Sequence, residues 1–217
     1  MSMDFVEVER AKSLAYFKQV EEIYLASFPV SQIRPTKMIT RMLEFDSNYH
    51  LFVVKQHDFL VGFSLLYAFN ELNIAFLDFM AIDKRYRGRS VGSRLFKYTL
   101  NASRQLVKNS IGLFFEIQRE SPRRHDKEEF RQRRIMFYRR HGAKALENIH
   151  YLLPDLHGGK PEDMYLMMVP NREITFLEKR LVFRIISKIY LTIYHFCYDS
   201  YHSDLTTAQL PPRIRLI

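Results

Sequence analysis

The stretch MAIDKRYRGRSVGSRLF, residues 80–96, places a glycine-bearing, arginine-rich loop between an apolar run and a helical pattern. The apolar run, residues 73–83, predicts a strand, and the spacing of Val91, Leu95 and Tyr98 predicts a helix directly after the loop. The first N–H groups of such a helix have no intrahelical partner, and the helix dipole is positive at that end. We therefore expect a phosphate-binding site here, the alternative being a basic surface loop.

The positive charge of the chain is concentrated around this loop and in one later segment. Residues 84–97 carry six Lys or Arg side chains and no acid, whereas residues 119–140 carry nine against four acids. The summed net charge of these two segments exceeds the formal net charge of the whole chain, +9, so the rest of the chain is slightly acidic. This distribution favours a polyanion bound at one site over a surface coated with charge for nucleic acid.

Composition points to a folded protein of a reducing compartment. The 217 residues are 47% hydrophobic, and Cys197 is the single cysteine, which excludes an intrachain disulfide. The first ten residues, MSMDFVEVER, lack an apolar leader, and the apolar run at 181–199 is interrupted by Arg184 and Lys188. We therefore expect a cytoplasmic protein with no membrane-spanning segment.

Periodicity predicts alternating helices and strands, with a loosely held tail over residues 205–217. The expected helices cover residues 6–28, 36–45, 126–140 and 175–199 and a segment from Val91, and the expected strands cover residues 50–56, 59–69, 73–83, 111–118, 143–153 and 164–170.

The opening stretch resembles the acyl-CoA-binding motif of the GNAT superfamily, the Gcn5-related N-acetyltransferases. In that motif Arg/Gln-x-x-Gly-x-Gly/Ala opens a helix, and the matching positions are Arg87, Ser90 and Gly92, with Ser90 in place of the first glycine. RRIMFYRRHGAKAL, residues 133–146, resembles the family's later helix, and IYLASFPVSQIRP, residues 23–35, resembles its N-terminal helix and exit.

This resemblance, which covers roughly residues 4 to 170, implies an α/β (α+β) fold. The expected fold is a mixed, mostly antiparallel sheet of six or seven strands flanked by helices. The resemblance therefore implies an acyltransferase domain over residues 1–170, followed by an amphipathic helix and tail over residues 171–217. It also implies transfer of an acetyl group from acetyl-CoA, or of an acyl group from another acyl-CoA, to an amine by direct attack.

The resemblance further implies which residues bind the acyl-CoA. Backbone groups on the strand would contact the pantetheine arm, and the loop and helix start would hold the pyrophosphate. These candidates are Met80, Ala81 and Ile82 on the strand and Arg87, Gly88, Arg89, Ser90, Val91, Gly92 and Ser93 after it.

Tyr138 occupies the position of the family's helix tyrosine and is the candidate acid for the leaving thiolate. The pKa of a phenol, near 10, is close to that of a thiol, so the proton transfer is nearly isoenergetic. The alternative is a core aromatic pair with Phe137.

Glu116 is the candidate base, because it interrupts an apolar strand where a carboxylate is costly without a partner or a function. The alternative is an ion pair with an arginine such as Arg119 or Arg134. Asp78 and Glu120 are further candidates for the base and for binding the substrate amine.

The second basic segment has several open interpretations. The family often has Asn at position 131, where this chain has Arg131. The segment could contact a phosphate of the donor, bind an anionic substrate, or form a solvated helix face with pairs such as Glu129 and Arg133. The eight histidines show no metal-ligand spacing, so we expect neither a metal nor a covalent intermediate.

The C-terminal amphipathic helix could pack on the sheet, pair with its copy in a homodimer, or lie on a membrane surface. Packing or dimerisation is favoured over the membrane. For the whole chain, the alternatives to an enzyme are a non-catalytic acyl-CoA-binding or regulatory domain and a basic module that binds nucleic acid or a membrane surface.

Overall fold

The computed structural model describes residues 6–11, 14–57, 59–119, 125–194 and 211–217. Its internal contacts divide the chain into two compact units, Met1–Ser110 and Ile111–Ile217. Within the described ranges, every helix is too short or too polar to cross a membrane.

The first unit is built on an antiparallel sheet in the order β1-β2-β3-β4. The apolar runs of its last three strands predicted them to within two residues at each end. The strands are β1 (Val6–Arg10), β2 (Tyr49–Gln56), β3 (Phe59–Phe69) and β4 (Ile74–Ile82).

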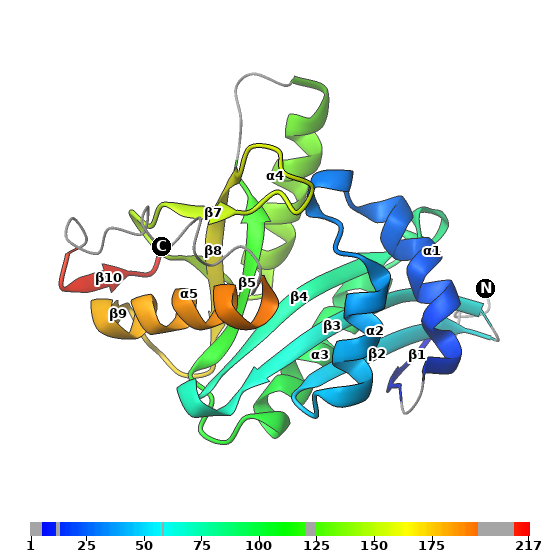
Figure 1. The fold of residues 1–217 in the computed structure, drawn as a ribbon, viewed down its shortest axis with the longest axis horizontal. Coiled ribbons are helices and arrows are strands. Elements are labelled where there is room, and N and C mark those ends of the chain that lie inside the picture. Colours follow the sequence, from blue (N-terminus) through cyan, green and yellow to red (C-terminus); the bar gives the residue numbers. More distant parts are fainter. Residues whose placement is uncertain (1–5, 12–13, 58, 120–124, 195–210) are drawn as a thin grey trace. The chain divides into compact units, whose positions relative to one another are not determined.

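Helices cover both faces of this sheet (Figure 1). On β3, Phe63 makes a ring contact with Tyr24 of α1, whereas the neighbouring Ser64 hydrogen-bonds Thr99 of α3 at 2.7 Å. Successive side chains of a strand point to opposite faces, so α1 and α3 lie on opposite sides. The helices are α1 (Phe17–Ser27), α2 (Thr36–Phe45) and α3 (Val91–Leu106), with short 3₁₀ turns at Leu14–Tyr16, Val30–Gln32, Asn70–Leu72 and Lys84–Tyr86.

The helix expected over residues 6–28 is wrong in its first part. Residues Val6–Arg10 form the edge strand β1, which pairs with β2, and the α-helix begins only at Phe17. The letters VEVER alternate apolar and charged side chains, which suits a half-exposed strand as well as a helix turn. Pairing with β2, whose partner residues lie 42 to 50 positions later in the chain, decides for the strand, and Glu9 adds a 2.8 Å ion pair to Lys55 of β2.

The second unit has its own antiparallel strands, with β8 at the centre. β5 pairs with β8, and β6 and β7 also pair with β8. The elements are β5 (Gly112–Gln118), α4 (His125–Arg140), β6 (Lys144–Ala145), β7 (Tyr151–Leu153), β8 (Glu162–Pro170), β9 (Phe176–Glu178), α5 (Lys179–Ile193) and β10 (Arg213–Arg215).

Helices α4 and α5 cover opposite faces of β5. Phe115 makes a ring contact with Tyr138 of α4, whereas the next residue, Glu116, accepts a hydrogen bond from Tyr194 at the end of α5. The apolar stripe of α5 is buried in the chain itself, as the packing interpretation expects. This stripe consists of Val182, Ile185, Ile186, Ile189, Tyr190 and Ile193.

Two elements of the second unit differ from expectation. The strand expected over residues 143–153 is two short strands, because Asn148 takes a left-handed backbone (φ 59°) between them. The helix expected from residue 175 begins at Lys179, after β9.

The tail is not loosely held where the structure describes it. β10 pairs with β9, and the N–H of Ala145 donates to the carbonyl of Ile217 at 2.7 Å. Ile214 and Leu216 are buried, which supplies the apolar contact that holds this segment. The sequence pattern alone gave no sign of these distant strand partners.

The architecture as a whole is the expected mixed α/β fold. The sheets are mostly antiparallel and are flanked by helices.

Candidate active site

The loop between β4 and α3, residues 83–90, turns sharply to begin the helix. Gly88 (φ 79°) and Ser90 (φ 61°) both take left-handed backbone conformations. At the start of the loop, the Asp83 carboxylate accepts the backbone N–H of Arg85 at 2.9 Å and its guanidinium at 2.7 Å. The hydrogen bonds from Arg85 hold the pKa of Asp83 below its usual value, so this carboxylate stays charged and fixes the first turn of the loop.

The N-terminus of α3 is open in the sense that no side chain caps it. Ser90 is the N-cap residue, its side chain makes no capping hydrogen bond, and the first turn holds no acidic residue. The N–H groups of residues 91–93 therefore lack a capping side-chain acceptor at the positive end of the helix dipole. An anion such as a phosphate would supply the missing acceptor, so the observed geometry fits the predicted binding site.

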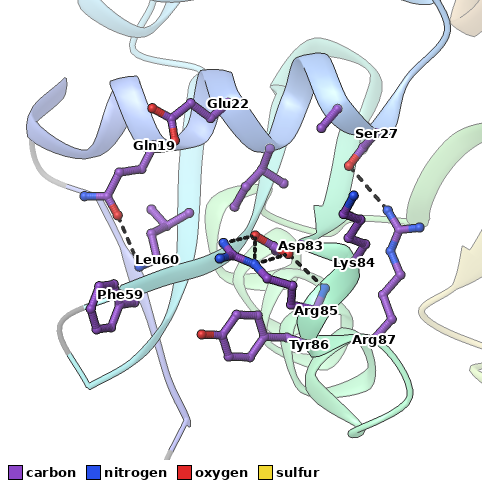
Figure 2. Close-up of a pocket in the computed structure, with 12 residues that line it drawn as sticks. Gln19, Glu22, Ser27, Phe59, Leu60, Asp83, Lys84, Arg85, Tyr86 and Arg87 are labelled. Atoms are coloured by element: carbon purple, nitrogen blue, oxygen red, sulfur yellow. Dashed lines mark hydrogen bonds and ion pairs between the residues drawn. The ribbon is translucent and has the colours of Figure 1, made fainter.

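Arg87 braces the loop from within. Its Nε donates to the carbonyl of Ile82 at the end of β4 at 3.0 Å, and its Nη2 lies 3.5 Å from the Ser27 hydroxyl of α1 (Figure 2). Arg89 lies with its guanidinium 5.9 Å from the ring centre of Tyr86. The guanidinium of Arg87 thus ties the loop to both the sheet and α1.

A pocket of about 730 Å³ lies between α1, the start of β3 and this loop (Figure 2). Its walls combine apolar, acidic and basic side chains, with Tyr86 and Phe59 on the side away from α1. The lining residues are Gln19, Glu22, Ile23, Ala26, Ser27, Phe59, Leu60, Asp83, Lys84, Arg85, Tyr86 and Arg87.

A β-bulge interrupts β4 at Asp78. Leu65 of β3 pairs with Phe79 and Leu66 pairs with Leu77, so no residue of β3 pairs with Asp78. The Asp78 side chain has no exposed area, although the residue as a whole is half-buried. The exposed part of Asp78 is therefore its main chain, which the bulge turns out of the ladder toward solvent.

The Asp78 carboxylate lies in a buried polar cluster on the α1 side of the sheet. Oδ2 accepts hydrogen bonds from the Arg34 guanidinium and the Tyr49 hydroxyl, and Arg34 also bonds Tyr49 at 3.0 Å. Burial raises the pKa of Asp78, while Arg34 and Tyr49 act against that rise. The backbone N–H of Arg34 donates to the Tyr24 hydroxyl at 2.7 Å, which ties the same loop to α1.

In the second unit, the Glu116 carboxylate accepts hydrogen bonds from two tyrosines. Tyr151 of β7 donates to Oε1, and Tyr194 donates to Oε2 at 2.9 Å. Burial and the neighbouring Glu116 raise the pKa of Tyr151 well above its usual value, so Tyr151 remains a proton donor. The Glu116 carboxylate is therefore oriented by O–H groups from two different elements.

Tyr138 packs deeply on the other side of β5. It is 7% exposed, its ring centre lies 4.4 Å from that of Phe115, and burial raises its pKa. The phenol therefore keeps its proton at neutral pH. Glu116 and Tyr138 are not brought together, since they lie on opposite faces of β5.

Comparison with known proteins decides the family of this chain. The acetyltransferase (GNAT) family model matches residues 17–143, which is more than half of the sequence. The chain belongs to the GNAT acetyltransferase family.

Solved structures of GNAT proteins share its fold. A GNAT-family acetyltransferase from Bacteroides thetaiotaomicron is 22% identical, with a TM-score of 0.68 over 87% of this chain and 98% of its own. The ribosomal-protein-S18-alanine N-acetyltransferase from Escherichia coli is 16% identical (TM-score 0.57, 78% and 96%). A GNAT acetyltransferase from Elizabethkingia anophelis with acetyl-CoA bound is 13% identical (TM-score 0.53, 77% and 99%). No curated protein gives a significant match to the sequence.

In this GNAT chain the predicted acyl-CoA-binding residues lie within one short stretch of the first unit, residues 80–93. Met80, Ala81 and Ile82 end β4, and residues 87–93 form the loop and the first turn of α3. Glu120 lies outside the described residues. Among the residues that the structure describes, no cluster of His, Cys, Asp and Glu is arranged to hold a metal ion.

Arg131 differs from its neighbours in the basic helix. It is 8% exposed, and its Nη2 lies 3.8 Å from Oε1 of Glu162 on β8. Glu129 and Arg133, by contrast, form the expected exposed pair along α4. The GNAT position that often carries asparagine is thus occupied here by an arginine whose side chain is buried within the second unit.

Sequence reasoning missed the side chains that hold the carboxylates of Asp78 and Glu116. These partners are Arg34 and Tyr49 for Asp78, and Tyr151 and Tyr194 for Glu116. A hydroxyl or guanidinium 29 to 78 residues away leaves no periodic signal. The one available hint was the placement of each carboxylate in an apolar strand, which required some partner.

Proposed function

We propose that this protein is an acyl-CoA-dependent N-acyltransferase that moves the acetyl group of acetyl-CoA to a primary amine by direct attack. The observation that carries the proposal is the β4–α3 loop with its uncapped, acid-free helix start, in a chain that belongs to the GNAT family. A solved relative of the same fold holds acetyl-CoA. The single cysteine supports a place in the cytoplasm.

The first unit would bind the donor through main-chain groups. Residues 91–93 would donate N–H groups to the diphosphate, with Arg89 and Arg87 adding positive charge near it, and the end of β4 would pair with the pantetheine arm as an added strand does. Acetyl-CoA would supply the reactive thioester. The main chain at the Asp78 bulge, exposed in β4, is suited to donate to the oxyanion that develops on the thioester carbonyl.

The second unit would move the two protons of the reaction. The amine nitrogen forms a bond to the carbonyl carbon as the carbon–sulfur bond breaks. Glu116 would take the proton that the amine loses, and Tyr138 would give a proton to the departing sulfur. The amine approaches the carbonyl carbon and the thiolate leaves it, so the base and the acid act on different atoms. We assign these two roles to Glu116 and Tyr138, which lie on opposite faces of β5.

Asp78 and Glu120 were candidates for holding the substrate amine. We propose a positioning role for the Asp78 carboxylate, because its side chain has no exposed area and is engaged by Arg34 and Tyr49. For Glu120, binding of the amine remains a prediction from the sequence.

Calorimetry with acetyl-CoA tests the donor site. Gly92→Asp places a carboxylate in the first turn of α3, where it suits the helix but repels a phosphate. We expect its affinity for acetyl-CoA to fall about tenfold or more relative to the neutral control Gly92→Asn, since two like charges about 4 Å apart near a surface repel by a few kcal/mol. Equal affinities for the two variants, or no binding by the wild type, would contradict the proposed site.

Release of free thiol with a panel of amines tests catalysis. We expect Glu116→Gln and Tyr138→Phe to reduce turnover by about 100-fold or more while the affinity for acetyl-CoA is retained. Binding of acetyl-CoA without thiol release by the wild type would favour the non-catalytic, regulatory alternative. Salt-sensitive binding to DNA or anionic vesicles without affinity for acetyl-CoA would favour the basic binding module.

A further inference from the structure

Helix α5 and the residue that ends it lie outside the segment matched by the family model, yet they reach the candidate base. The match ends at residue 143, whereas Tyr194 follows the last turn of α5 and donates its hydroxyl to Oε2 of Glu116 at 2.9 Å. Tyr194 is 4% exposed. The C-terminal segment is thus in direct contact with a carboxylate of the part of the chain that the family model matches.

The contact is part of a fixed arrangement and not of a loose surface pair. Tyr190, one turn earlier on α5, stacks near Tyr151 with ring centres 5.5 Å apart and near Tyr194 at 6.1 Å. The Tyr190 hydroxyl donates to the carbonyl of Leu152 on β7. This bond anchors α5 to β7, and the anchored helix then presents Tyr194 to the carboxylate.

Because both carboxylate oxygens accept an O–H, Glu116 has little freedom to rotate. We propose that Tyr194 is a positioning residue for the base Glu116, so that the C-terminal helix is a working part of the acyltransferase site. This inference rests on the proposed function for its catalytic meaning, although the contact itself can be tested without turnover. Tyr194 would fix which lone pairs of Glu116 face the acceptor and would keep the carboxylate ionised, since hydrogen bonds to the charged form favour it.

The groups that face Glu116 in the described residues come from three elements. β8 places the apolar Leu166 opposite Glu116, β7 contributes Tyr151, and α5 contributes Tyr190 and Tyr194. Further along the same strands, the charged side chains bond elsewhere. Arg119 bonds Asp163 and two main-chain carbonyls, and Glu162 bonds Gln118 and Arg131.

Carbon-13 NMR of the glutamate carboxyl groups provides the test. The Glu116 signal is identified by its loss in Glu116→Gln, and its pKa is measured in the wild type and in Tyr194→Phe. We expect the pKa to rise by about one unit in Tyr194→Phe, because one hydrogen bond to the charged form is lost. The acid limb of the pH profile of turnover should move to higher pH by the same amount.

Tyr190→Phe is the matched control. It removes a hydroxyl from the same helix but keeps the hydroxyls of Tyr151 and Tyr194, so the Glu116 pKa should shift clearly less than in Tyr194→Phe. An unchanged pKa in Tyr194→Phe overturns the inference. Equal shifts in both variants also overturn it, because they would mean that any loosening of α5 is felt at Glu116.

Two safeguards keep the outcome decisive. If Tyr194→Phe does not fold, the Tyr194 Cζ resonance of the wild type should still titrate together with the Glu116 carboxyl, and independent titration refutes the contact. If the carboxyl pKa shifts as expected but no amine is ever acetylated, the contact is real and the proposed function has failed. If turnover is present and its pH profile does not follow the Glu116 pKa, the proposed function stands and the positioning role falls.

Discussion

Ser90 holds a backbone conformation that favours glycine, at the point where the β4–α3 loop enters α3. Its φ of 61° lies in the left-handed region, where a Cβ approaches the following carbonyl and costs about 1–2 kcal/mol. The family motif has glycine at this position. Serine is therefore expected to cost stability here relative to glycine.

Ser90→Gly should stabilise the protein by about 0.5–1 kcal/mol, since relief of the strain exceeds the extra flexibility gained by the unfolded chain. Chemical denaturation measures this change. The control is Ser93→Gly, three residues later in the first turn of α3, which should destabilise by up to about 1 kcal/mol because glycine is a poor helix former. A loss of stability in Ser90→Gly would show that the serine hydroxyl makes a compensating contact.

At the scale of elements, a buried ion pair fastens the connection between α1 and α2 to the bulge in β4. Arg34 lies in that connection, two residues before α2, and its guanidinium bonds Asp78 with neither side chain exposed. The guanidinium also lies 5.1 Å from the ring centre of Phe79. The connection is therefore held against the same strand whose main chain is proposed to serve the reaction.

Arg34→Met should destabilise the protein by about 3 kcal/mol or more, because it leaves the Asp78 carboxylate buried without its cation. The loss should shrink as pH falls, since a protonated Asp78 carries no charge to bury. In a double-mutant cycle with Asp78→Asn, measured by urea unfolding, the double variant should lose at least about 1 kcal/mol less than the sum of the single losses. Strict additivity would mean that the two side chains do not depend on each other.

The elements found from sequence are those whose signals are local. The β4–α3 loop was predicted because Gly88, Ser90 and Gly92 lie within five consecutive positions, directly before a helix pattern. β1 was missed because VEVER fits two periodicities and only its partner β2 decides between them. The carboxylates Asp78 and Glu116 were found as anomalies in apolar strands. Their partners could not be found, because tertiary contacts over long separations leave no trace in spacing.

At the scale of the molecule, strands of each unit pair with segments that are distant in sequence. In the second unit the last described residues return to the sheet, where Ala145 and Ile217 exchange backbone hydrogen bonds of 2.7 and 3.0 Å. Leu216 pairs with Leu146 as an isolated bridge, and its side chain is 6% exposed. Ile214 and Leu216 thus belong to the core of this unit, whereas the other residues of this segment are exposed.

Leu216→Ala should cost about 2–3 kcal/mol of unfolding free energy, since it opens a cavity in a buried contact. Ile217→Ala is the matched control. Its side chain is 51% exposed and its backbone bonds would remain, so the change should be within about 0.5 kcal/mol. Denaturant titration of both variants compares them directly, and similar small losses would show that the terminal segment contributes little.

The alternation of side chains along β5 limits how such a protein can diverge. Phe115 and Glu116 are adjacent, yet Phe115 contacts α4 and Glu116 contacts the end of α5 on the opposite face. Inserting or deleting a single residue here would exchange the two sides, whereas a shift by two would preserve them. Homologous chains are thus expected to keep the spacing along this strand or to change it by two residues at a time.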